Sequence, residues 1–230
     1  MIEKTLKTTK GKIRVKIPSY LDEVTLGQTM QLQDKPQLND LDAVSILSGI
    51  PVDELQNVQN IDDFQAFEDA IISLSDQIKN FYNSDQVPDK ITFQFDGRNT
   101  TVKIISNLSI EPAGAFMASR DVIAEEINEH IKLHGEEDWK ENFNPSLNAC
   151  CHILAHYFYC KVTGEKYNEY KAEEFCEQVK QLKVAEAMPI AKYFFTSYPN
   201  LWKPKISYWH RFRQLWKKRR VLMLSVNSNT

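Results

Sequence analysis

Apolar and polar residues alternate in two parts of the chain, and this alternation predicts two β-hairpins. The expected strands are 4–8 with 12–17 in the first hairpin and 91–95 with 101–105 in the second. A period of two is typical of a half-buried strand, and the glycine within each turn, Thr9-Lys10-Gly11 or 96–99, supplies the positive φ that a tight hairpin requires.

The second hairpin belongs to a block that repeats the first at an offset of 87 residues. Aligned without a gap, residues 15–34 and 102–121 share eight identities in twenty positions, and one of these pairs Gly27 with Gly114. Each copy passes from a strand pattern through a short loop to helical spacing, so we interpret the chain as a duplicated unit. This interpretation predicts that the two copies superpose as strand, loop and helix start, with the two glycines in equivalent places.

Apolar residues recur every three or four positions between and after the hairpins, and this spacing predicts helices. In the first unit the expected helices run from Thr25 to Leu32, from Asn39 or Asp40 to Gly49, from Pro51, and from Asp62 or Asp63 along the apolar stripe Phe64, Phe67, Ile71, Leu74, Ile78 and Phe81. In the second unit they run from Pro112 to His134, from about Pro145 to Cys160, along Tyr170, Phe175, Val179 and Leu182, and from Val184 to Tyr198. Strands followed by helices, twice over, predict an α+β fold.

The loop 83–89 is the best internal boundary, because it combines turn-forming residues with no apolar period. We therefore expect a first hairpin-plus-helices unit at 1–88 and a second, larger one at 89–200. A basic aromatic C-terminal arm follows at 201–230.

The C-terminal arm concentrates positive charge and tryptophan. No Asp or Glu follows Glu186 but nine Lys and Arg residues do, so residues 1–186 carry a net charge of −12 within a chain total of −3. Aromatic residues between 208 and 216 have helical spacing, which places them on one face with basic residues around the other sides. The predicted partner-binding residues are Trp202, Tyr208, Trp209, Arg211, Phe212, Arg213, Trp216, Lys217 and Arg220.

An aromatic face of this kind is seldom exposed to water, and the sequence allows several alternatives for what buries it. The arm can pack on its own chain or on another subunit, lie beside nucleic acid, or bind a membrane surface. The acidic remainder of the chain would be repelled by phosphate, which favours a protein partner such as the acidic surface of another copy. We rank protein first, DNA second and a membrane last.

His152, His156 and Cys160 are spaced four residues apart, which places them on roughly one helix face as in some metal sites. Their segment is apolar nearly all round, and this favours a buried central helix with Cys160 as a core residue. We predict no metal and no cofactor. The cysteines, Cys150, Cys151, Cys160 and Cys176, are expected to be free thiols.

Composition and motifs argue against catalysis. The chain is 42% hydrophobic and 26% charged, as in an ordinary globular protein, and contains neither of the glycine-rich phosphate-binding motifs. It has no nucleophile elbow, and Cys150-Cys151 lies in an apolar run, so we predict that the protein is not an enzyme. With no signal peptide pattern and no membrane-spanning stretch, we expect it to be made and kept in a cytoplasm.

Three segments carry a resemblance to a known group of proteins, namely residues 17–28 (IPSYLDEVTLGQ), 46–55 (ILSGIPVDEL) and 108–114 (LSIEPAG). They resemble proteins of tailed phages that infect Bacteroidetes, particularly crAss-like phages. The resemblance spans most of residues 12–205, and its motifs are structural ones. Comparable genes lie among those for head, tail and associated virion proteins, so the resemblance implies a virion component or an assembly factor.

The resemblance, taken with these patterns, implies a non-enzymatic virion protein, and we expect an oligomeric ring subunit of the head-tail connection or tail. Its expected partners are copies of itself and other virion proteins, after assembly in the host bacterial cytoplasm. A tail-assembly chaperone is one alternative. A packaged protein that contacts DNA through residues 203–220 is another.

Overall fold

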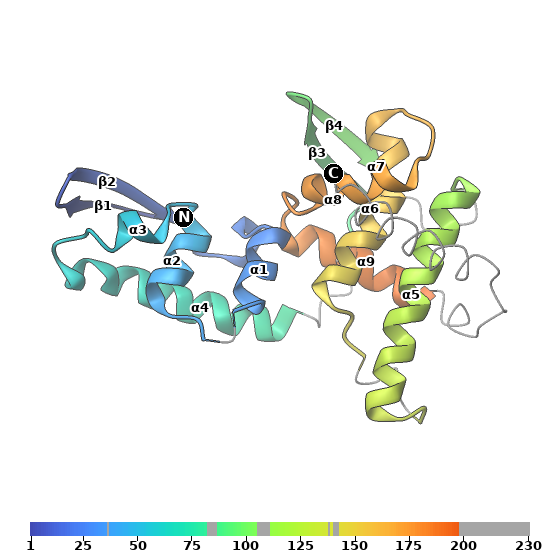
Figure 1. Cartoon of the computed structure of the whole chain (residues 1–230), viewed down its shortest axis with the longest axis horizontal. Helices are drawn as coiled ribbons and strands as arrows, with labels where there is room; N and C mark the ends of the chain where they lie inside the picture. Colours follow the sequence, from blue (N-terminus) through green and yellow to red (C-terminus); the bar gives the residue numbers. More distant parts are fainter. Residues whose placement is uncertain (36, 82–86, 105–110, 138, 140–142, 198–230) are drawn as a thin grey trace, which may run out of the picture.

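The computed structural model describes residues 1–35, 37–81, 87–104, 111–137, 139 and 143–197, and its fold is α+β, as the sequence predicts (Figure 1). The first hairpin lies at one end of an elongated molecule, together with helices α2 (Asp40–Ser48) and α4 (Gln65–Phe81). Toward the other end, α5 (Ala113–His134) lies beside the central helix α6 (Leu147–Thr163).

Both predicted hairpins are present, and each is an antiparallel sheet of two strands. The strands are β1 (Ile2–Thr8) with β2 (Gly11–Ile17), and β3 (Lys90–Phe95) with β4 (Arg98–Lys103). The predicted three-residue tip at 9–11 is wrong, because Gly11 belongs to β2 and pairs with Thr8 across a two-residue turn. The predicted four-residue tip at 96–99 is wrong as well. Asp96 and Gly97 both have positive φ, 48° and 72°, which closes a two-residue turn and pairs Phe95 with Arg98.

The N-terminal helices begin and end where the sequence places their caps. Thr25 and Gln28 form a reciprocal capping box at the start of α1 (Leu26–Gln33), and Asn39 accepts from the Asp42 amide at the start of α2. Gly49 ends α2 in the left-handed conformation with φ of 73°. Pro51 precedes the short helix α3 (Val52–Leu55).

The long helix expected from Asp62 or Asp63 begins differently. A 3-10 turn, η2 (Ile61–Phe64), precedes α4, and its cap is Asn60, which accepts from the Asp62 amide. A second 3-10 turn, η1 (Leu21–Glu23), lies between β2 and α1. Of the apolar stripe predicted from Phe64 to Phe81, Phe64, Phe67 and Leu74 are buried and Ile71 is partly buried. The side chains of Ile78 and Phe81 lie outside the described residues.

The single helix predicted along Tyr170–Leu182 is wrong. Two short helices, α7 (Glu169–Glu174) and α8 (Cys176–Val179), meet at Phe175, and Tyr170 is 51% exposed. The break turns Phe175 inward, where its ring centroid lies 5.6 Å from that of Phe93 on β3. The segment therefore packs its aromatic ring against β3 and does not form one continuous amphipathic helix. The last described helix, α9 (Val184–Ser197), follows the predicted course, and Tyr198 lies outside the described residues.

The central helix α6 is buried, as predicted. Twelve of its 17 residues are buried, and Tyr157, Phe158 and Tyr159 are among them. It runs from Leu147 to Thr163, a shift toward the C-terminus that follows from a Ser146 cap at its start and from Gly164, with φ of 71°, at its end.

One hydrophobic core extends through both predicted units. It includes Leu6 and Phe67 from the first and Phe158 and Phe194 from the second. Backbone hydrogen bonds also join them, from the Leu26 amide to the Leu182 carbonyl at 2.8 Å and from Val184 to Val24 at 2.9 Å. The division at residue 88 stays a prediction.

Gly27 and Gly114 are each the second residue of a helix, α1 and α5 respectively. A strand precedes each of these helices in the chain, β2 before α1 and β4 before α5. Residues 105–110, which connect β4 to α5, lie outside the described residues. The duplication therefore stays a prediction.

Candidate interaction surfaces

The predicted partner-binding residues all lie outside the described residues. These are Trp202, Tyr208, Trp209, Arg211, Phe212, Arg213, Trp216, Lys217 and Arg220. Within the described residues, two surfaces of opposite charge are candidates for partner contact, one on the first hairpin and one on α4.

The first hairpin presents a basic surface to solvent. Residues 1–17 contain five lysines, one arginine and one glutamate, a net charge of +5, whereas residues 18–186 contain 30 acidic and 13 basic residues, a net charge of −17. The period of two turns the apolar side chains of Leu6, Val15 and Ile17 inward and leaves polar ones outside. We define the basic face by its five exposed residues, Lys7, Lys10, Lys12, Arg14 and Lys16.

The pairing of β1 with β2 sets like charges opposite each other on this face. Lys7 pairs with Lys12 in the strand register, and facing like charges destabilise a hairpin. One acidic side chain, Glu3, meets the face through an ion pair of 2.7 Å to Arg14. An acidic partner would relieve the repulsion between the lysines, so the basic face is suited to binding an anionic surface.

The acidic candidate is a hollow beside α4. This shallow, open depression of about 680 Å³ is lined by Leu21, Asp69, Ile72, Ser73, Asp76 and Gln77. One wall comes from η1, held to α4 by a hydrogen bond of 3.0 Å from the Leu21 amide to the Gln77 side-chain oxygen. Ile72 is 62% exposed between Asp69 and Asp76, so the hollow offers both apolar area and negative charge.

Sequence reasoning assigned partner binding to the arm alone and missed both surfaces. The basic face had a visible signal, because Lys12, Arg14 and Lys16 alternate along a predicted strand and must share one side of it. The hollow had no comparable signal, because Leu21 and Ile72 meet only through folding.

His156 and His152, two of the three side chains weighed as metal ligands, point to separate partners. His156 is buried and its Nδ1 lies 3.0 Å from the Tyr167 hydroxyl, whereas His152 Nδ1 lies 3.6 Å from Cys176 Sγ. Cys160 is half-buried, and burial raises the pKa of its thiol. Within the described part of the chain, no three His, Cys, Asp or Glu side chains gather as a metal site.

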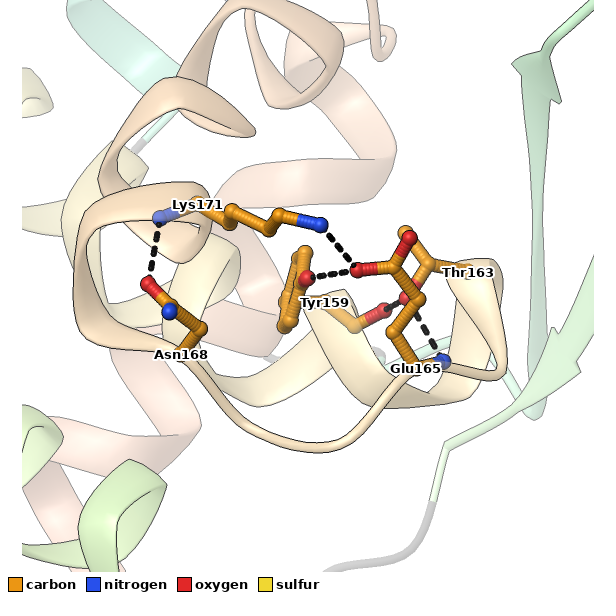
Figure 2. A network of polar contacts seen from close by, with 5 residues as sticks. All are labelled: Tyr159, Thr163, Glu165, Asn168 and Lys171. Carbon is orange, nitrogen blue, oxygen red and sulfur yellow. Dashed lines mark hydrogen bonds and ion pairs between the residues drawn. The ribbon is translucent and has the colours of Figure 1, made fainter.

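A polar network fixes the turn between α6 and α7 (Figure 2). Glu165 Oε2 accepts from the Tyr159 hydroxyl at 2.6 Å and from the Lys171 ammonium at 2.7 Å, and the Glu165 amide donates to Thr163 Oγ1 at 3.2 Å. The hydrogen bond from Lys171 lowers the pKa of Glu165 most, and the hydrogen bond from Tyr159 has the next largest effect. The network holds the segment that carries Tyr167 against α5 and α6.

Comparisons of the chain with models of protein families, with curated proteins and with solved structures give no match. None of the described helices combines the length and the apolar character needed to cross a bilayer.

Proposed function

We propose that this chain is a non-enzymatic structural protein of a crAss-like phage virion, acting as a subunit of an oligomeric ring at the head-tail connection or in the tail. The separation of opposite charges carries the proposal. A basic hairpin and a basic arm flank residues 18–186, which carry a net charge of −17. In such a subunit, opposite charges are paired when the basic surface of one copy meets the acidic surface of the next. Head-to-tail contacts of this kind form a ring when the rotation between neighbours closes.

The α4 hollow is the proposed binding site for the arm of the neighbouring subunit. Residues 203–220 contain eight basic residues and no acidic one, which complements Asp69 and Asp76. The aromatic residues of the arm would cover Ile72 and Leu21. The basic face of the hairpin supplies a second electrostatic contact with an acidic neighbour.

Aromatic burial is expected to set the affinity of this contact. Burying apolar area contributes about 25 cal/mol per Å², which amounts to several kcal/mol for three large aromatic side chains. An exposed ion pair contributes about 0–1 kcal/mol. The charged residues therefore orient the subunits and speed their association, and the tryptophans hold them together.

Sedimentation velocity of the full chain over a range of concentrations tests the contact. We expect discrete large oligomers for the full chain, a loss of these oligomers on truncation at Asn200, and weakened association for Asp69→Asn/Asp76→Asn. A matched control is Glu136→Gln/Glu137→Gln, which removes two exposed carboxylates away from the hollow. Equal association of the two double variants would contradict the assignment of the hollow. A full chain that stays small at every concentration would favour a tail-assembly chaperone.

DNA contact is a second candidate, favoured by the basic face of the hairpin. A two-stranded ribbon with lysines at alternate positions presents charges about 7 Å apart along one strand and can follow a phosphate backbone. Binding of a DNA duplex that falls steeply with salt, with a slope of about −0.9 per phosphate contacted, would support this candidate. The slope should then drop when Lys7 and Lys12 are replaced by glutamine.

A further inference from the structure

Two cysteines and a histidine meet at the junction of α6 and α8. Cys176 begins α8, and its Sγ lies 3.6 Å from Nδ1 of His152 on α6. Cys151, the neighbour of His152 on α6, has its thiol 3.6 Å from the backbone carbonyl of Cys176. The partial exposure of His152 opens one side of this group, while Cys176 and Cys151 are 7% and 1% exposed.

The charges around the group favour a thiolate on Cys176. The thiol of Cys151 and then the imidazole of His152 lower the pKa of Cys176, and the ammonium of Lys180 acts in the same direction. Reciprocally, Cys176 raises the pKa of His152, which Glu173 on α7 raises further. Lys180 is itself paired with Glu177 at 2.6 Å. Both pKa shifts act toward a thiolate on Cys176 and an imidazolium on His152, and burial opposes each of them.

The other cysteines lie in surroundings that keep them protonated. Burial raises the pKa of Cys150 and of the half-buried Cys160, and the hydrogen bond to Cys176, followed by burial, raises that of Cys151. Since the thiolate is the nucleophilic form of cysteine, Cys176 stands apart from the other three.

We propose that Cys176 is an oxidation site for hydroperoxides, and that Cys151 converts its oxidised form into an internal disulfide. The Cys176 thiolate attacks one peroxide oxygen, the O–O bond breaks, and the leaving oxygen departs as hydroxide or alkoxide, which takes up a proton. Sulfur is oxidised to sulfenic acid and the peroxide is reduced. The Cys151 thiol then attacks the sulfenic sulfur, an S–S bond forms, and water leaves with the Cys151 proton.

The position of the group connects this chemistry to the contact between α8 and α1. The Gly27 amide donates to the Lys180 carbonyl at 2.9 Å, and a Cβ at Gly27 would lie only 3.0 Å from the Lys180 Cβ. A disulfide at the start of α8 would thus act one turn away from a tight contact with the N-terminal half of the chain. Oxidation is expected to change amide hydrogen exchange at Gly27.

Peptide mapping of the unmodified full chain tests the proposal without any substitution. After treatment with hydrogen peroxide, we expect a Cys151–Cys176 disulfide with a mass loss of two hydrogens and no modification of Cys160. In Cys151→Ser, dimedone should instead trap a sulfenic acid on Cys176. The matched control, Cys160→Ser, should form the disulfide as the unmodified chain does.

The role of His152 is tested by the pH dependence of alkylation. With iodoacetamide at pH 6.5, Cys176 should react first among the four cysteines, and His152→Asn should move the midpoint of its pH–rate profile upward, because the imidazole lowers the pKa of Cys176. Circular dichroism checks that the variant is folded. Faster modification of Cys150 or Cys160 in the native chain, or a Cys176 that reacts only after unfolding, would overturn the proposal. These measurements are independent of assembly, so they can fail while the ring proposal stands.

Discussion

Gly114 allows a close approach between α5 and the turn that follows α6. A Cβ at this position would lie 2.6 Å and 2.7 Å from two ring carbons of Tyr167, closer than atoms of this kind can approach. The Tyr167 ring cannot simply turn away, because its hydroxyl is hydrogen-bonded to His156 Nδ1 at 3.0 Å. Absence of a side chain on α5 therefore lets Tyr167 reach its buried partner.

Gly114→Ala should lower the free energy of unfolding by about 1–3 kcal/mol, the usual cost of overpacking. Alanine is otherwise favoured over glycine inside a helix by up to about 1 kcal/mol, so the sign of the effect decides whether the contact is rigid. Urea denaturation measures it. In a Tyr167→Ala background, Gly114→Ala should lower the free energy of unfolding much less. If Gly114→Ala alone stabilises the protein, the Tyr167 ring moves aside at little cost and the contact is not rigid.

Tyr159 and Glu165 make the stability of the α6–α7 turn dependent on pH. The pKa of Glu165 is lowered in the folded protein, so its contribution is present above the ordinary carboxylate range and is lost as the pH falls through the folded value. Burial raises the pKa of Tyr159 to about 12, so its contribution is present below about pH 10 and is lost as the pH rises through about 12.

Tyr159→Phe should therefore lower the thermal midpoint at pH 7, and the difference from the unmodified chain should shrink in acid as Glu165 becomes protonated. Differential scanning calorimetry at several pH values follows this change. Tyr20→Phe, at a residue that is 64% exposed, is the control and should have little effect at any pH. A Tyr159→Phe difference that is constant from pH 7 into acid would contradict the role of Glu165.

Local signals predicted most elements. Thr25, Asn39 and Gly49 marked helix ends because their caps depend on residues within one turn, and the period of two marked both hairpins. The break at Phe175 was missed because the apolar spacing from Tyr170 to Leu182 fits one helix as well as two. Packing of Phe175 against Phe93, which is distant in the sequence, decides between them.

The basic face makes a prediction for the first hairpin as an element. Lys7→Gln/Lys12→Gln removes two facing like charges, so the hairpin itself should be unharmed or slightly stabilised. Association of the full chain should nevertheless slow and lose part of its salt dependence, because the steering charge is smaller. Stopped-flow light scattering measures the rate. Lys132→Gln/Lys166→Gln, at two exposed lysines outside the hairpin, is the charge-matched control, and an equal effect would mean that net charge alone matters.

At the scale of the whole molecule, the sequence revealed the asymmetry of charge but not the surfaces on which it lies. Counting charges separated the basic arm from the acidic residues before it. The hollow beside α4 depends on η1 and α4 meeting in space, and the group around Cys176 joins residues 24 positions apart. Such long-range contacts have no periodic signal in a single sequence.

The arm also yields a prediction at this scale. Truncation at Asn200 should leave the circular dichroism of the remaining chain unchanged in shape while abolishing assembly, because Pro199 and Pro204 interrupt the chain just before the arm. Trp209→Ala/Trp216→Ala should reproduce the loss of assembly, whereas Arg211→Ala/Arg213→Ala should weaken it less. If the arginine pair abolishes binding and the tryptophan pair does not, and the loss follows salt with a phosphate-like slope, the arm contacts nucleic acid.

The measurement that tests the ring proposal most directly is the copy number of this chain in purified phage particles, determined by quantitative mass spectrometry against the other virion proteins. A ring subunit should be present in every preparation at one small, fixed number of copies per particle. That number should be unchanged after high-salt washing, because buried aromatic contacts resist screening. Absence of the chain from particles that are otherwise complete would contradict the proposal and favour an assembly chaperone.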